Sequence, residues 1–177
     1  MGRLDVALGG VALIARRTPT PETLLDYAQL LRVAGRAADA DRQLELADAA
    51  HRIFRANGGR DDLAGAQIAL AKGDPATAVR LAEAEFGRRP FAEVADTLGR
   101  ALHAAGRDRE ALGYARRAAS GSPDAAYAYH LATVALALGD RPTALKQLRR
   151  VRDSNRYFSP ADGPTAARAL AALEASS

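Results

Sequence analysis

The sequence contains no cysteine and no tryptophan, and few of its side chains are aromatic. Without cysteine the chain forms no disulfide and offers no thiolate to a metal, although this says little about its compartment. Aromatic residues make up 5% of the chain, so large rings do not fill the space between its elements. The elements must therefore approach closely through small residues. No apolar run approaches the roughly 20 residues that span a membrane.

The residues that are abundant favour helices. Hydrophobic residues make up 48% of the 177 positions, and alanine dominates them. Alanine has the best helix propensity, and runs of β-branched residues are nearly absent. The composition predicts an all-α chain, long enough for one compact domain or for one short solenoid.

One spacing recurs along the chain and divides it into units. Five glycines are separated by 33, 38, 33 and 33 residues: Gly2, Gly35, Gly73, Gly106 and Gly139. Five residues after each glycine stands an alanine: Ala7, Ala40, Ala78, Ala111 and Ala144. Four residues further on, the same helical face carries Val11, Leu44, Ala82, Ala115 and Leu148. The spacing predicts helix-turn-helix units in which glycine ends the first helix and alanine lets the second pack closely.

The best-matched unit reads Ala95-x2-Leu98-Gly99-x2-Leu102, then Ala111-x3-Ala115, then Pro123. It resembles the tetratricopeptide repeat (TPR), a unit of about 34 residues. Over nearly its whole length the chain is also similar to the C-terminal part of bacterial multi-repeat TPR proteins, in strings such as FRANGG, EFGRRP and YFSP. The resemblance implies a right-handed α-solenoid of antiparallel helix pairs with a C-terminal capping helix. It also implies a scaffold that binds a polypeptide, without an assigned activity.

We predict a single TPR domain over 1–177. Its parts are a half repeat at 1–19, repeats at 21–57, 59–90, 91–123 and 124–156, and a capping helix at 160–177. Thr20, Asp74 and Asp140 are expected to cap helices, the first two followed by Pro21 and Pro75 at the first helical position. The capping helix, expected from about Thr165 to Ala175, should bury Ala166, Ala169, Leu170 and Leu173.

The first helix, predicted from Leu4 to Ala15, lacks the partner that its repeat would normally supply. Its apolar surface is expected from Leu4, Leu8, Val11 and Ile14. This surface predicts a homodimer through the N-terminal helix, or a separate chain that supplies the absent helix. Fraying at Gly9–Gly10 is the alternative, and a fragment of a longer TPR protein is another.

The repeat from Gly35 to Gly73 is five residues longer than the others, and the extra residues include Ile53 and Phe54. We expect Phe54 to continue the core stripe Ala40, Leu44, Ala47 and His51. The alternative is an apolar ledge for a partner.

If the first helices line a concave groove, as the resemblance implies, helical spacing gives the residues that face it. The partner-binding residues predicted there are Gln29, Arg32, Gln67, Asp96, Arg100, His103, Tyr129 and Thr133. Glutamine supplies donors and acceptors for a peptide backbone, and arginine pairs with carboxylates. The alternative is that these residues form solvated helix faces.

Catalytic and cofactor signatures do not appear in the sequence. No nucleophile motif, phosphate loop or metal-spacing motif is present, so we predict no enzyme activity, no cofactor and no metal. His103 and His130, with Asp96 as a third group, are the residues we would test for an active site.

The charge balance argues against nucleic acid as the main partner. The net charge is +4, with arginines interleaved among 21 acidic residues. Nucleic-acid binding through the basic cluster from Arg149 to Arg156 is kept as the alternative function. The short apolar run at 6–15 fits the repeat spacing better than an export signal, so we expect a cytoplasmic protein.

Overall fold

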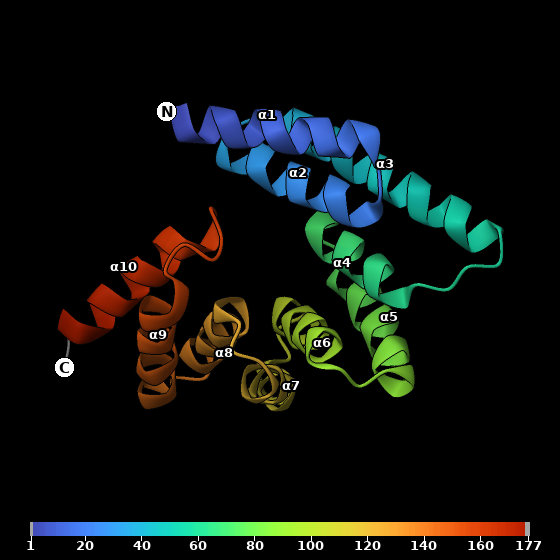
Figure 1. The fold of residues 1–177 in the computed structure, drawn as a ribbon. Coiled ribbons are helices and arrows are strands. Elements are labelled where there is room, and N and C mark those ends of the chain that lie inside the picture. The colour runs from blue at the N-terminus through green and yellow to red at the C-terminus, as the bar shows by residue number, and fades with distance from the viewer. Residues whose placement is uncertain (1, 176–177) are drawn as a thin grey trace. The chain divides into compact units, whose positions relative to one another are not determined.

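The computed structural model describes residues 2–175, and within them it is all-helical (Figure 1). The helices are α1 (Gly2–Arg17), α2 (Pro21–Val33), α3 (Ala37–Ala56), α4 (Asp62–Lys72), α5 (Pro75–Arg88), α6 (Ala92–Ala104), α7 (Asp108–Gly121), α8 (Ala125–Ala137), α9 (Arg141–Asn155) and α10 (Asp162–Ala175). The chain divides into two compact units, the first ending at Leu81 and the second beginning at Ala82, so the division falls within α5.

Consecutive helices pack as antiparallel pairs inside each unit. In the first unit α2 packs against α3, while α1 packs on α2, and α4 contacts both α2 and α3. In the second unit the pairs are α6 with α7 and α8 with α9, followed by α10 on α9 (Figure 1). This arrangement confirms the all-α repeat predicted from the glycine spacing.

The predicted turn glycines end the first helix of each pair, except at the start of the chain. Gly35, Gly73, Gly106 and Gly139 have φ angles of 74°, 77°, 73° and 74°. In this left-handed region a side chain is strained, which explains why glycine recurs. The next residue in each turn donates its N–H to a helix carbonyl five residues back, as Arg36 does to Leu31 at 2.8 Å. Gly2 instead begins α1, so the prediction of a turn there is wrong.

The predicted caps are confirmed. Thr20 Oγ1 accepts from the N–H of Thr23 at 3.3 Å, Asp74 Oδ1 from that of Thr77 at 3.0 Å, and Asp140 Oδ1 from that of Thr143 at 3.1 Å. Hydrogen bonds from Thr77 hold the pKa of Asp74 below its usual value, and those from Thr143 do the same for the pKa of Asp140. Each carboxylate therefore satisfies a helix-end donor while ionised.

Small residues stand among the leucines and valines of each core where paired helices meet. Ala40, Ala78, Ala111 and Ala144 are completely buried, as the repeat predicted. The helices of one pair approach closely at Gly99 of α6, where an added Cβ would lie 3.2 Å from the backbone nitrogen of Ala115 in α7. Alanine and glycine therefore set the separation of the helices.

The core of α3 ends earlier than we predicted. His51 is buried and its Nε2 lies 2.8 Å from the carbonyl oxygen of Asp61 in the chain that leads to α4. Phe54, however, is 50% exposed, so the prediction that it continues the core stripe is wrong. Its ring occupies the space where a Cβ of Gly59 would stand, at 2.4 Å. The extra turn of α3 carries Phe54 past the buried stripe, onto the returning chain.

The first helix is better covered than we predicted. Leu8 is 9% exposed and packs with Leu31 and Leu44, so its assignment to an outer surface is wrong. Leu4 and Val11 are partly buried, while Ile14 is 52% exposed. The side of α1 that packs on the other helices of the first unit thus runs through Leu4, Leu8 and Ala15.

The last helix begins earlier than we predicted, at Asp162 instead of Thr165. Ser159 Oγ accepts from the N–H of Asp162 at 3.1 Å and moves the start forward by capping it. Ala166, Leu170 and Leu173 are buried against α8 and α9 as expected, and Ala169 is partly buried.

Replacing Gly99 with valine should lower the free energy of unfolding by about 1–3 kcal/mol, because the added atoms meet backbone that cannot move aside. Gly113 of α7 is the matched control, since a Cβ there has nothing within 4 Å. Gly113→Val should be close to neutral. Denaturant unfolding followed by circular dichroism measures both variants, and equal effects would contradict the close approach of α6 and α7.

Candidate functional site

The open face of α6 and α8 is the candidate binding surface of the second unit. Arg100 of α6 is exposed, and the described residues give it no hydrogen bond or ion pair. Most arginines of the second unit have an acidic or carbonyl partner, for example Arg107 with Glu110 at 2.7 Å. An unpaired guanidinium on a folded surface is free to pair with a carboxylate of another molecule.

A buried hydrogen bond joins α6 to α8 beneath this face. Asp96 Oδ1 lies 2.8 Å from His130 Nδ1, and Asp96 is 5% exposed. We predicted that Asp96 would contact a partner directly, which its burial contradicts. The contact fixes the imidazole ring and directs its other nitrogen, Nε2, away from Asp96. Asp96 therefore positions His130, which the sequence did not single out for binding.

His103 has a different partner from the one considered in the sequence. Its Nδ1 contacts the carboxylate of Asp108 at the start of α7, across the turn that contains Gly106. The structure thus separates the two histidines: Asp96 belongs with His130, and Asp108 with His103. Within the described residues no group of three or more His, Cys, Asp or Glu side chains is placed to hold a metal.

Tyrosines flank the Asp96–His130 pair. Burial, and then the charges of Asp96, Glu93 and Asp124, raise the pKa of Tyr127 to about 12. The phenol of Tyr127 therefore stays protonated at neutral pH and is a hydrogen-bond donor.

The predicted residues Tyr129 and Thr133 serve mainly internal contacts. The Tyr129 ring packs against Phe158 with 5.5 Å between centroids, at the edge of the core around α10. The Thr133 hydroxyl donates to the carbonyl of Tyr129 at 3.0 Å. The Thr133 hydroxyl can still accept a hydrogen bond from another molecule.

In the first unit the predicted residues lie on α2 and α4, which contact each other. Gln29 is exposed and Gln67 is partly buried. Arg32 is exposed and lies 3.5 Å from Asp41 of α3. The structure thus places two amides and one paired arginine on this unit's first helices.

Two of the four arginines in the basic cluster at 149–156 are paired with carboxylates. Arg149 Nε lies 3.0 Å from Glu174, and Arg152 Nε lies 2.7 Å from Asp153. Arg156 stacks on the exposed ring of Tyr157, with 4.7 Å from its Cζ to the ring centroid. This pairing does not favour a phosphate-binding surface.

Arg117 of α7 and Arg150 of α9 have a role that the sequence analysis missed. Arg150 donates to the carbonyls of Ala119 at 2.8 Å and Ser122 at 2.6 Å, at the end of α7. Arg117 donates to the carbonyl of Pro90 at 3.1 Å. Both arginines stand 11 residues after a turn glycine, and that common offset was the signal in the sequence. Each arginine ties the second helix of one repeat to the end of the preceding repeat.

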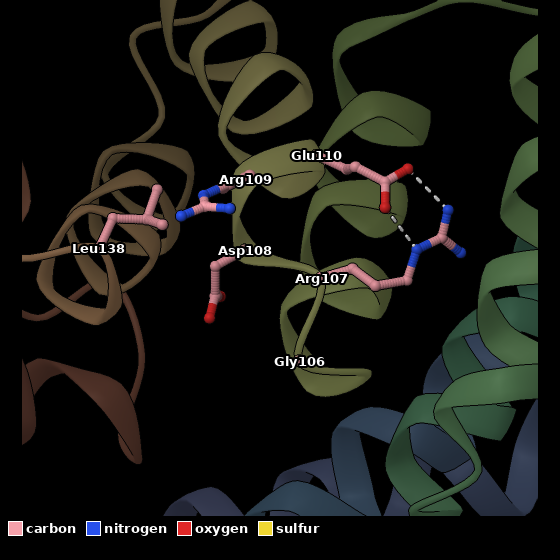
Figure 2. A pocket seen from close by; sticks show the side chains of 6 residues that line it. All are labelled: Gly106, Arg107, Asp108, Arg109, Glu110 and Leu138. Carbon is pink, nitrogen blue, oxygen red and sulfur yellow. Dashed lines mark hydrogen bonds and ion pairs between the residues drawn. The ribbon is translucent and has the colours of Figure 1, made fainter.

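A shallow depression of about 360 Å³ lies where the turn between α6 and α7 meets the end of α8. Its lining is Gly106, Arg107, Asp108, Arg109, Glu110 and Leu138. Figure 2 shows Arg107 and Glu110 paired with each other, and Arg109 extending on the other side toward Leu138. The lining is mostly charged and open to solvent, which is unlike an enclosed small-molecule site.

Comparisons with known proteins bear on the fold. No protein-family model matches the chain, and no curated protein matches it. Among solved structures, a thermophilic TPR protein from Thermus thermophilus superposes with a TM-score of 0.66, covering 98% of this chain and 91% of that chain at 18% sequence identity. The chain therefore has a TPR-like fold. None of the described helices has the length and apolar character needed to cross a bilayer.

Replacing Asp96 with alanine should lower the free energy of unfolding by about 1–3 kcal/mol, because His130 loses its buried acceptor. Asp96→Asn should cost less, since the amide oxygen still accepts from Nδ1–H. Asp108→Ala is the matched control: its partner His103 is more exposed, so the cost should stay below about 1 kcal/mol. Thermal and denaturant unfolding compare the three, and an Asp96→Ala effect no larger than that of Asp108→Ala would contradict the argument.

Proposed function

We propose that the protein is a non-catalytic interaction module that binds an acidic segment of a partner polypeptide on the face formed by α6 and α8. The observation that carries the proposal is Arg100, whose guanidinium is exposed and has no partner among the described residues. It lies one turn after Asp96 on α6, beside the hydrogen-bonded pair Asp96–His130. Arginine contributes a bidentate contact to a carboxylate, and such charged hydrogen bonds contribute more than neutral ones.

His130 and Thr133 complete this binding face. With Nδ1 held by Asp96, the other ring nitrogen of His130, Nε2, is the atom that we expect to hydrogen-bond the backbone of the bound segment. Thr133 adds a hydroxyl one turn away on the same helix. In the first unit, Gln29 and Gln67 are proposed to contact a peptide backbone in the same way. The cytoplasmic location stays the prediction made from the sequence.

The proposal is tested on a partner captured from a lysate at about 300 mM salt, where phosphate-dominated binding has faded. Arg100→Ala should weaken the affinity of the purified partner about tenfold, the loss expected for one charged hydrogen-bonded contact. Titration calorimetry measures the dissociation constant, and circular dichroism checks that helix content is unchanged.

Arg109→Ala is the matched control, because Arg109 is also exposed but lies at the start of α7, outside the proposed face. Its effect on affinity should be less than about twofold. Equal losses for the two variants, or no loss for Arg100→Ala, would reject the α6–α8 face as the binding surface.

We further propose that two copies of the chain pair through α1. Support comes from the side of this helix that faces away from α2, where Val6 is 77% exposed and Leu13 is 46% exposed. Apolar side chains grouped on one helix face are stabilised when another helix covers them. This surface replaces the one predicted from Leu4, Leu8, Val11 and Ile14, of which Ile14 alone is exposed.

Light scattering of the full chain should report a dimer, and Leu13→Glu should convert it to a monomer by placing a charge in the contact. Leu46→Glu is the matched control, since Leu46 is a leucine of α3, outside the proposed contact, and is also about half exposed. It should leave the dimer intact. A monomeric parent chain, or equal effects of both substitutions, would contradict the pairing.

A further inference from the structure

Two rows of residues run along the outward side of α1. One consists of Val6, Gly10, Leu13 and Arg17, and the other of Asp5, Gly9, Ala12 and Arg16. Successive members are four, three and four residues apart, the spacing that keeps side chains on one side of a helix. That order of intervals reads the same in both directions along the helix.

The charges of these rows lie at opposite ends and have opposite signs. Asp5 is exposed at the start of α1, and Arg16 and Arg17 are exposed at its end. Among the described residues none of the three has an ion pair; Arg16 Nε donates to the carbonyl of Ala12 at 3.2 Å.

The middle of the outward side has no side chains at Gly9 and Gly10. A Cβ added at Gly9 or Gly10 would have no atom within 4 Å, so these glycines expose helix backbone to solvent. Gly9–Gly10 costs helix stability relative to alanine. It leaves a notch in which the side chain of a neighbouring helix fits closely.

From these features we infer that the second copy lies antiparallel on α1, with the two-fold axis near residue 11. This inference rests on the proposed pairing and adds its polarity and register. In this arrangement Leu13 of each copy lies over Gly9–Gly10 of the other, and Asp5 lies opposite Arg16 and Arg17. A two-fold contact requires a surface that is complementary to itself, and this one is so in both charge and shape. An unrelated helix would have no such reason to match both ends.

Charge reversal tests the arrangement in the full-length protein. Asp5→Lys alone, or Arg16→Glu with Arg17→Glu, should raise the dimer dissociation constant at least about tenfold, because each change acts twice in a two-fold pair. All three changes together should return it to within about threefold of the parent value. Sedimentation at low salt measures the constants, and Arg109→Glu, far along the chain in α7, is the control expected to leave them unchanged.

Single cysteines test the polarity independently, because the chain has none of its own. Disulfide formation requires Cα atoms within about 7 Å. At about 1.5 Å per residue, the antiparallel pair holds the two copies of position 10 about 3 Å apart along the helix and those of position 6 about 15 Å apart. Gly10→Cys should therefore cross-link on oxidation, whereas Val6→Cys should link only when mixed with Arg17→Cys.

The outcomes separate this inference from the proposed pairing. A parent chain that stays monomeric at all concentrations overturns both. A dimer that ignores the charge reversals, is not restored by the triple change, or cross-links through Val6→Cys alone overturns the antiparallel register and leaves the pairing standing. Restoration by the triple change together with the expected cross-links supports it.

Discussion

Close approach of paired helices is the constraint on which the rest of this structure depends. At Gly99 the backbone of α7 lies close to where a side chain would begin. The other pairs have an alanine at this position, seven residues before the turn glycine, and all three are buried: Ala28, Ala66 and Ala132. Small residues bury little area each, so each pair gains stability by packing backbone against backbone along its length. The scarcity of aromatic residues follows from the same geometry, because a ring would hold the helices apart.

Features that depend on neighbours in the chain were predictable from the sequence. The turn glycines at 35, 73, 106 and 139 and the caps at Thr20, Asp74 and Asp140 follow from local backbone requirements. Features that depend on packing were not. Helical spacing placed Asp96 on the open face, yet its carboxylate is buried because His130, one repeat later, draws it between α6 and α8. Phe54 was expected in the core and is half exposed, because α3 continues beyond its last buried residue, His51.

The two proposed surfaces differ in physical character. The face of α6 and α8 is polar and is held from below by a hydrogen bond, so it is arranged before any partner arrives, which lowers the entropy lost on binding. The outward side of α1 carries exposed apolar side chains between its charged ends, and two glycines that lower the stability of this helix. A partner on α1 would therefore also stabilise the helix that it covers. The same fold offers one surface that is rigid in advance and one that gains order from contact.

Arg150 has a consequence for how the second unit comes apart. Its guanidinium holds carbonyls of Ala119 and Ser122 at the end of α7, which would otherwise need water as their donor. When α9 unfolds, these two carbonyls therefore lose their donor at the same time as α7 loses its packing. Arg117 repeats this dependence one repeat earlier, at Pro90. Loss of the C-terminal repeat therefore weakens the end of the repeat before it. We expect neighbouring repeats to unfold in a coupled way and not as independent helix pairs.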